Sequence, residues 1–99
     1  DLLAVSRLNS THAVRLYELL SQFKSTGYRV MTIADFRFAM DVVNTNKGTK
    51  ELKRAVLNPA VKQLNEKSDL FCIVEDIKDG RTITGFKFIF RTQEQKKLF

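Results

Sequence analysis

The segment LKRAVLNPAVKQLNEKSDL, residues 52–70, decides how the fold is interpreted. Its apolar residues recur at helical spacing, yet its middle holds Pro59, the only proline in the chain. A proline inside a helix removes one backbone donor and clashes with the preceding turn, which costs about 3 kcal/mol or more. The segment is therefore one kinked helix, or two helices of which the second has Asn58 as its cap and Pro59 at its first position. Because the apolar stripe continues in register across Pro59, we favour one kinked helix.

The two sides of this helix differ in chemistry. Thr49 has the residue type of a helix cap, so we expect the helix to follow it. The apolar side consists of Leu52, Ala55, Val56, Pro59, Ala60 and Leu64. The opposite side carries Lys50, Arg54, Asn58, Lys62 and Asn65, with Lys53 at its margin. Residues 47–67 hold six basic side chains and two acidic ones, so this helix has a local net charge of +4.

Capping residues and helical spacing predict two further helices upstream. Asn9, Ser10 and Thr11 are capping residue types, and we expect a helix to follow them and to end at residues 25–27. Its core face is Ala13, Leu16, Tyr17, Leu20 and Phe23. A short extended piece, residues 28–31, leads to a second helix that Thr32 caps, with Asp35 in the capping-box position. The apolar stripe of that helix is Ile33, Phe36, Met40 and Val43, and residues 44–48 form a turn.

The last third of the chain has the pattern of a β-hairpin. Residues 70–75 are rich in β-formers, and Lys78-Asp79-Gly80-Arg81 follows, in which Asp-Gly is typical of a type I′ turn. In the return strand, residues 82–90, the alternating Phe86, Phe88 and Phe90 share one face. The predicted order of helix, short strand, two helices and hairpin is that of a winged helix, an α+β fold. Residues 9–90 form this domain, and residues 91–99 form a basic polar tail.

Length and charge narrow the class of protein. The 99 residues suit one domain, and 43% apolar residues are enough for a packed core. A net charge of +6 attracts nucleic acid, acidic proteins or anionic membrane, although no apolar run approaches the length of a membrane span. The single cysteine, Cys72, excludes an internal disulfide. It lies in an apolar run, so we interpret it as a small buried side chain in a reducing cytosol.

Three stretches resemble the second, C-terminal winged-helix domain of iteron-binding plasmid replication initiators, the Rep proteins. They are SRLNSTHAVRLYELL (residues 6–20), residues 52–70, and IKDGRTITGFKFIF (residues 77–90). The resemblance implies sequence-specific binding of double-stranded DNA at plasmid origin repeats (iterons) and initiation of plasmid DNA replication. It implies that residues 1–8 are the connection from a missing first winged-helix domain. It also implies host replication proteins as partners, a homodimer of the full-length protein, and a bacterial-type cytoplasm.

Several side chains are candidates for contact with DNA. A helix with one apolar and one basic face can lie in the major groove, which is about 12 Å wide. Arg54 can pair with guanine and Asn58 with adenine through two hydrogen bonds each, whereas Lys47, Lys50 and Lys53 suit phosphates. Lys78 and Arg81 flank the tip of the hairpin wing. Ser10 and Thr11 offer hydroxyl and backbone N–H groups to a phosphate, although simple capping explains them equally well. We expect Arg15 to pair with a carboxylate.

Enzymatic chemistry is not expected. His12 and Cys72 are the only histidine and cysteine, too few for a zinc site, and there is no phosphate-binding glycine loop. We expect no cofactor, no metal and no role for the membrane. Tyr17 and Tyr28 are interpreted as core or rim aromatics rather than nucleophiles.

Three other interpretations remain open. The basic helix side could be a solvated surface. The winged helix could be a protein-interaction or dimerisation module that uses Leu2, Leu3, Val5 and Phe99. The chain could also be a transcription regulator of related fold. Titration with duplex DNA separates DNA binding from protein contact, and repeated binding sites separate an initiator from a regulator.

Overall fold

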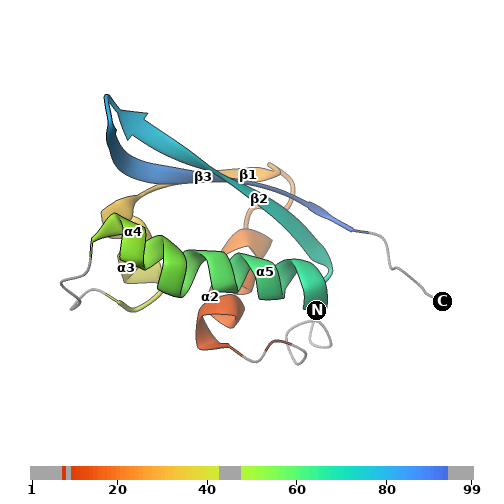
Figure 1. Ribbon diagram of the computed structural model, residues 1–99. Coiled ribbons are helices and arrows are strands. Elements are labelled where there is room, and N and C mark those ends of the chain that lie inside the picture. The colour runs from red at the N-terminus through yellow and green to blue at the C-terminus, as the bar shows by residue number, and fades with distance from the viewer. Residues whose placement is uncertain (1–7, 9, 43–47, 94–99) are drawn as a thin grey trace.

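The computed structural model describes residue 8, residues 10–42 and residues 48–93. Its elements follow the predicted order (Figure 1). They are α2 (Thr11–Ser21), β1 (Tyr28–Thr32), α3 (Ile33–Ala39), α4 (Thr49–Leu52), the π-helical turn η1 (Lys53–Leu57), α5 (Asn58–Lys67), β2 (Leu70–Asp79) and β3 (Thr82–Thr92). Several expectations lie outside the described residues. They are those for the N-terminal connection, for Val43 and Lys47, for most of residues 44–48 and for most of the C-terminal tail.

The strands form one antiparallel sheet in the order β1-β3-β2. Figure 1 shows the helices on one face of this sheet, while the β2–β3 hairpin extends beyond the body of the domain. Phe86, Phe88 and Phe90 of the central strand all point to the helical side and are at most 5% exposed, which confirms the predicted alternation.

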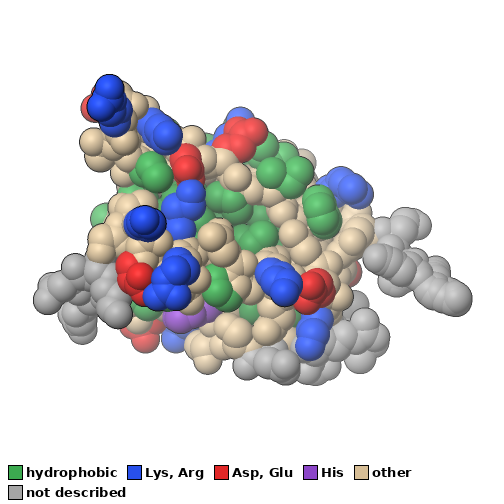
Figure 2. All heavy atoms as spheres, viewed as in Figure 1, with side chains coloured by type: hydrophobic (Ala, Val, Ile, Leu, Met, Phe, Trp, Pro, Cys, Tyr) green, Lys and Arg blue, Asp and Glu red, His purple; other side chains and the backbone are tan. Residues whose placement is uncertain are grey.

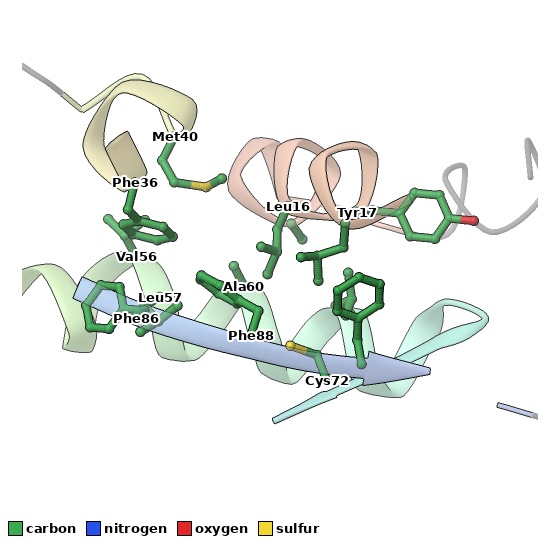
Figure 3. Packing of buried hydrophobic residues seen from close by; sticks show 14 of the residues in the cluster. Leu16, Tyr17, Phe36, Met40, Val56, Leu57, Ala60, Cys72, Phe86 and Phe88 are labelled. Atoms are coloured by element: carbon green, nitrogen blue, oxygen red, sulfur yellow. The ribbon is translucent and has the colours of Figure 1, made fainter. Parts of the chain in front are cut away.

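A cluster of aromatic rings joins α3 to the sheet (Figure 3). The ring of Phe36 lies edge-on to that of Phe86, with centroids 5.4 Å apart, and stacks near Phe88 at 6.0 Å. On the first helix, Ala13, Leu16, Tyr17 and Leu20 are buried as predicted, although α2 ends at Ser21 and Phe23 is only partly buried. Cys72 is 2% exposed, and burial raises the pKa of its thiol to about 12, so it is the inert core side chain expected.

The chain is helical without a break from Thr49 to Lys67. Asn58 has helical backbone angles (φ −63°, ψ −43°) and its N–H donates to the carbonyl of Lys53, five residues back. The two-helix alternative is therefore wrong, because a capping residue would be non-helical. A π turn immediately precedes the proline and widens the helix where Pro59 supplies no donor and where its ring would crowd the carbonyl of Ala55.

The buried side of this helix differs from the prediction at three positions. Leu52, Val56, Ala60 and Leu64 are buried as expected, in a row with a spacing of four residues. Ala55 and Pro59 were expected in the core but are exposed, and Leu57 is buried in their place at 1% exposure. Because Leu57 flanks the row on one side and Ala55 and Pro59 flank it on the other, periodicity alone does not tell which flank meets the core.

Two of the three predicted helix caps are confirmed. Ser10 Oγ accepts from the N–H of Ala13 at 3.2 Å, and Thr32 Oγ1 accepts from the N–H of Asp35 at 3.0 Å. The third expectation was wrong, because Thr49 is the first helical residue and Gly48 is the cap. Gly48 has no side chain that could accept a hydrogen bond, so this helix begins without a side-chain cap.

The hairpin turn also differs from the prediction. Asp79 pairs with Thr82, so the two loop residues are Gly80 and Arg81 rather than Asp79 and Gly80. Only Gly80 has a positive φ, +66°, which is the pattern of a type II′ turn with glycine at its first central position. A register shift between Ile77 and Lys78 leaves Thr84 with no residue opposite it on β2, and this bulge moves the loop by one residue.

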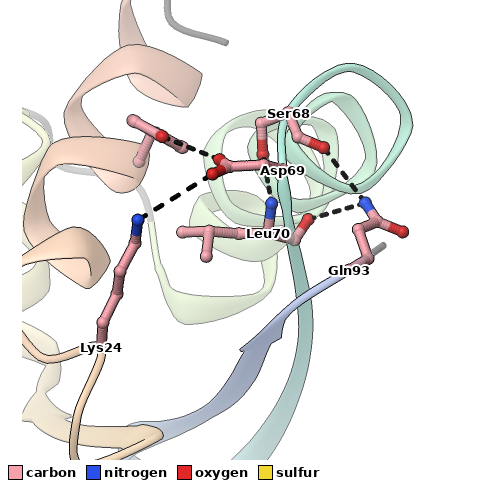
Figure 4. Close-up of polar contacts among 6 residues, drawn as sticks. Lys24, Ser68, Asp69, Leu70 and Gln93 are labelled. Atoms are coloured by element: carbon pink, nitrogen blue, oxygen red, sulfur yellow. Dashed lines mark hydrogen bonds and ion pairs between the residues drawn. The ribbon is translucent and has the colours of Figure 1, made fainter. Parts of the chain in front are cut away.

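Polar side chains fasten the end of α5 to the sheet (Figure 4). The amide of Asn65 receives the N–H of Cys72 at 2.7 Å and donates to the carbonyl of the same residue at 2.9 Å, so it pairs with β2 as a neighbouring strand would. Gln93 Nε2 donates to the carbonyls of Asn65, Ser68 and Leu70 at 3.0–3.1 Å. Tyr17 donates to Asp69 at 2.7 Å. These contacts fix the helix relative to the strands.

Candidate nucleic-acid interface

A row of polar side chains runs along the outer surface of the long helix. Lys50, Arg54, Asn58 and Lys62 are all exposed and lie opposite the buried row, and we call these four residues the basic helix face. Figure 2 shows lysine and arginine side chains distributed along this helix and at the tip of the hairpin. Ala55 and Pro59 are exposed on the same helix and are short, so they leave the longer basic side chains free to project.

Arg54 on the basic helix face is paired with Glu51. Its Nε donates to Glu51 Oε1 at 3.1 Å, and its second terminal nitrogen donates to the other carboxylate oxygen. The pKa of the guanidinium is raised by these hydrogen bonds and by the charge of Glu51. The Arg54 side chain is nevertheless 71% exposed, so the pair orients the guanidinium at the surface without burying it.

Lys53, at the margin of this face, is turned toward the hairpin. Its Nζ lies 2.9 Å from both carboxylate oxygens of Asp76 on β2, and both side chains are less than one third exposed. This ion pair joins the π turn to the wing across 23 residues of sequence. The charge of Lys53 is therefore balanced by Asp76, and a phosphate would have to compete with that carboxylate.

The wing carries the second basic group. Lys78 near the turn end of β2 and Arg81 in the hairpin loop are both exposed, and none of the described residues forms an ion pair with either. Figure 1 shows this tip projecting beyond the sheet, on the side of the molecule that carries α4. The tip and the start of the basic helix face are thus at the same end of the domain.

Ser10 and Thr11 lie apart from that end. The backbone N–H of Ser10 donates to Gln63 at 3.0 Å, which places the start of α2 beside the later turns of α5. Gln63 is about 14 Å along the helix axis from Arg54. The Ser10 hydroxyl accepts from Ala13, whereas Thr11 is exposed. Arg15 forms the expected carboxylate pair, with Asp41 at 3.7 Å.

The remaining chemical candidates are dispersed. Tyr17 is a core residue whose pKa is raised to about 12, first by burial and then by its hydrogen bond to Asp69. Tyr28 is 49% exposed on the sheet, and His12 is partly exposed on α2. The described part of the chain brings no three His, Cys, Asp or Glu side chains together as a metal ion would require. Among the same residues, no helix is long and apolar enough to cross a membrane.

The outer face of the sheet carries four exposed apolar side chains, which the sequence did not indicate, next to Lys87, which lies opposite Val30 and over the ring of Tyr28. Tyr28, Ile89 and Ile73 are partners across the three strands and are 49%, 37% and 54% exposed. Val30 extends this patch at 51% exposure. We call these four residues the outer sheet patch. Because neighbouring side chains on a strand alternate between faces, the same strands supply both this patch and the core.

Sequence reasoning missed two acidic residues that shape the interface. Glu51 was counted only as a negative charge, although its spacing of three residues from Arg54 is the signal for a side-chain pair on a helix. Asp76 had no such signal, because its contact with Lys53 depends on how the hairpin crosses the helix. Of the predicted DNA-binding residues, the structure places Lys50, Arg54 and Asn58 together on the helix, and Lys78 and Arg81 at the wing tip.

A family model, a related sequence and a solved structure each match this chain. The family model described as "Initiator Rep protein, WH2" matches residues 32–90. A relative from Escherichia coli, an uncharacterized 27.6 kDa protein, is 46% identical over 65 residues, which is 64% of this chain and 27% of that protein. The crystal structure of Pi initiator protein in complex with iteron DNA aligns with a TM-score of 0.78 and 23% identity, over 93% of this chain and 42% of that chain. The chain thus spans less than half of either protein, and the structural match confirms the winged-helix fold.

Proposed function

The chain belongs to the family of initiator Rep proteins, as their second winged-helix domain, and we propose that it binds duplex DNA at repeated origin sequences (iterons) in the initiation of plasmid replication. The observation that carries the proposal is the basic helix face, which runs along the long helix and starts at the end of the domain from which the wing projects. A solved structure with the same fold is that of an initiator bound to iteron DNA, and this supports the choice of ligand.

The helix geometry fits the major groove. An α-helix with its side chains is about 10–12 Å across, and the groove of B-form DNA is about 12 Å wide. The opposite side of this helix is anchored by Leu52, Val56 and Ala60 in the core, so only the basic helix face is available to DNA. We assign Arg54 and Asn58 to base edges because both side chains can form two hydrogen bonds with a single base.

Phosphate contacts are assigned by charge and position. Lys50 near the helix start is the first candidate, and Lys47, three residues earlier in the sequence, is the second. Lys78 and Arg81 would bind the DNA backbone beside the groove. Lys53 is a conditional contact, because Asp76 holds it in the free protein. Ser10 and Thr11 would reach a phosphate only if DNA also contacted the start of α2.

The first test is the salt dependence of DNA binding. If about five phosphates are neutralised, the logarithm of the binding constant should fall with the logarithm of salt concentration at a slope of about −4 to −5. Fluorescence anisotropy with a labelled duplex at several salt concentrations gives this slope. A slope near zero would contradict the phosphate assignments.

The chain should also bind more weakly than a protein with both winged-helix domains, because tethering raises the effective concentration of the second domain.

Pro59→Ala tests the shape of the helix. The substitution restores a backbone donor and raises helix propensity, so we expect the free energy of unfolding to be unchanged or higher. The added donor favours α-helical bonding in place of the π turn, which would rotate Lys50 and Arg54 relative to Lys62 and weaken DNA binding. Thermal melting and anisotropy measure the two effects separately. Equal or tighter binding by the variant would show that the π turn has no part in docking.

The wider role follows from the family. We propose that the chain works with a first winged-helix domain, that the complete protein contacts host replication proteins, and that it forms a homodimer in one of its states. We further propose a non-catalytic role on plasmid DNA in a bacterial cytoplasm. Footprinting on the plasmid of origin would identify the repeats and would separate an initiator from a transcription regulator of the same fold, which needs no repeated sites.

The outer sheet patch favours a second candidate, a protein-interaction module. Four large apolar side chains that are 37–54% exposed on adjacent strands form the kind of surface found at protein contacts. Ile73→Ser should leave DNA binding unchanged if the helix and wing are the DNA surface. If the domain instead serves protein contact alone, the wild-type chain will not bind duplex DNA, and Ile73→Ser will abolish whatever association it shows by sedimentation.

A further inference from the structure

Glu51 holds one edge of the Arg54 guanidinium. The carboxylate bonds to Nε and to one terminal nitrogen, so both of its oxygens are used on the same side of the planar group. Glu51 is 32% exposed and Arg54 71% exposed, which means that the carboxylate is the more enclosed partner and the guanidinium is the outer one. The pair lies on the first turns of the helix, beside Lys50 on the basic helix face.

A guanidinium has a second edge with the same capacity. It carries five N–H donors in a rigid plane, and the edge formed by the two terminal nitrogens remains able to donate two parallel hydrogen bonds when the Nε edge is occupied. Guanine presents two acceptors, O6 and N7, in the major groove at a spacing that suits such an edge. In this geometry Glu51 occupies the Nε edge of Arg54 and leaves the edge formed by the two terminal nitrogens without a bond to that carboxylate.

We infer that Glu51 is a positioning residue that sets the preference of Arg54 for guanine. This inference rests on the proposed function and adds the residue that makes one of its contacts selective. An unpaired arginine on an exposed helix samples many rotamers and binds any nearby phosphate, which carries no sequence information. A guanidinium held in one orientation has already lost that freedom and presents its donors to a base edge.

Two other roles for Glu51 make different predictions. It is the third residue of the helix, where a negative charge also interacts favourably with the helix dipole. A carboxylate on a DNA-binding surface also repels phosphates. A dipole role depends only on the charge of residue 51, and repulsion of phosphates lowers the affinity for all sequences equally. A positioning role depends on both the charge and the length of the side chain, and it changes the preference at one base pair.

The experiment is an in vitro selection of bound duplexes from a pool with a randomised core, carried out with the wild-type chain and with its variants. For the wild type we expect enrichment of a sequence that includes a guanine lost in Arg54→Ala. For Glu51→Ala we expect the preference at that position to fall roughly 5-fold, because the guanidinium is no longer oriented, while the other selected positions remain. Glu51→Gln keeps the reach and one acceptor oxygen, so it should retain part of the preference.

Two controls separate the alternatives. Glu51→Asp keeps the charge near the helix start but shortens the side chain, so a positioning role predicts loss of guanine preference and a dipole role predicts none. Glu66→Ala removes an equal charge from the exposed side of α5, and it should raise affinity for all duplexes without changing the selected sequence. Melting curves confirm that each variant is folded.

The outcomes are distinct. Unchanged guanine enrichment in Glu51→Ala and Glu51→Asp, with the wild type selecting a clear sequence, would overturn the positioning role and leave the proposed function in place. A wild-type chain that binds duplexes without enriching any sequence would overturn sequence-specific binding and this inference with it. The result expected is loss of the guanine in Arg54→Ala, a weaker preference for the same guanine in Glu51→Ala and Glu51→Asp, and no change at that position in Glu66→Ala.

Discussion

Gly85→Ala is expected to lower the free energy of unfolding by about 1–3 kcal/mol or more. A Cβ at this position would lie 2.4 Å from the carbonyl oxygen of Met31 and 3.3 Å from the Cα of Thr32. Both are backbone atoms of β1, so no side-chain rotation relieves the clash. Gly85 pairs with Thr32 on one side and with Ile77 on the other, which means that the substitution would force β1 away from the central strand.

Chemical denaturation followed by circular dichroism measures this loss. Gly48→Ala is the matched control, because a Cβ there meets no atom within 4 Å and the backbone φ of −76° suits any residue. It should cost no more than about 1 kcal/mol, the difference between glycine and alanine at a helix cap. If both variants lose the same stability, the close approach of β1 to β3 does not account for the glycine at position 85.

The parts of the fold that follow a repeating apolar pattern were predictable from the sequence. Phe86, Phe88 and Phe90 alternate, and the row Leu52, Val56, Ala60 and Leu64 recurs every four residues, so both faces could be identified without coordinates. Such patterns reflect burial against a large neighbour, which averages over many contacts. The order of helices and strands followed from them, and with it the winged-helix fold.

Features that depend on one contact could not be predicted. The type II′ turn arises because the bulge at Thr84 shifts the register by one residue, and no local signal distinguishes this from a type I′ turn on Asp79-Gly80. The π turn could be suspected from Pro59, but its site at residues 53–57 depends on how the helix packs. Leu57 was missed in the core for the same reason.

In the candidate site, too, some features follow from the repeating pattern and others depend on a single contact. The exposed positions of Lys50, Arg54 and Asn58 follow from the helix period. The partner of Lys53 does not, because Asp76 reaches it only after the hairpin has folded over the helix. Charge on a helix surface thus identifies candidates for DNA contact, while tertiary contacts decide which of them are free to make it.

The substitutions Arg54→Ala and Lys50→Ala should separate base recognition from phosphate binding. Arg54→Ala is expected to weaken binding to the cognate repeat about 10-fold to 100-fold and binding to scrambled DNA much less, because a guanidinium forms two hydrogen bonds with guanine. Lys50→Ala should weaken both complexes by similar factors and flatten the salt slope by about one unit, since an ammonium is a point charge that binds a phosphate.

Neither substitution should change the melting temperature much, since both side chains are exposed and the ion pair of Arg54 is at the surface. This separates a binding defect from unfolding. Anisotropy titrations of both variants with the cognate repeat and a scrambled duplex, each at several salt concentrations, give the affinity ratio and the slope together. If Arg54→Ala weakens the two complexes equally, Arg54 contacts only phosphate, and the reading of sequence must be assigned to Asn58, Lys53 or the wing.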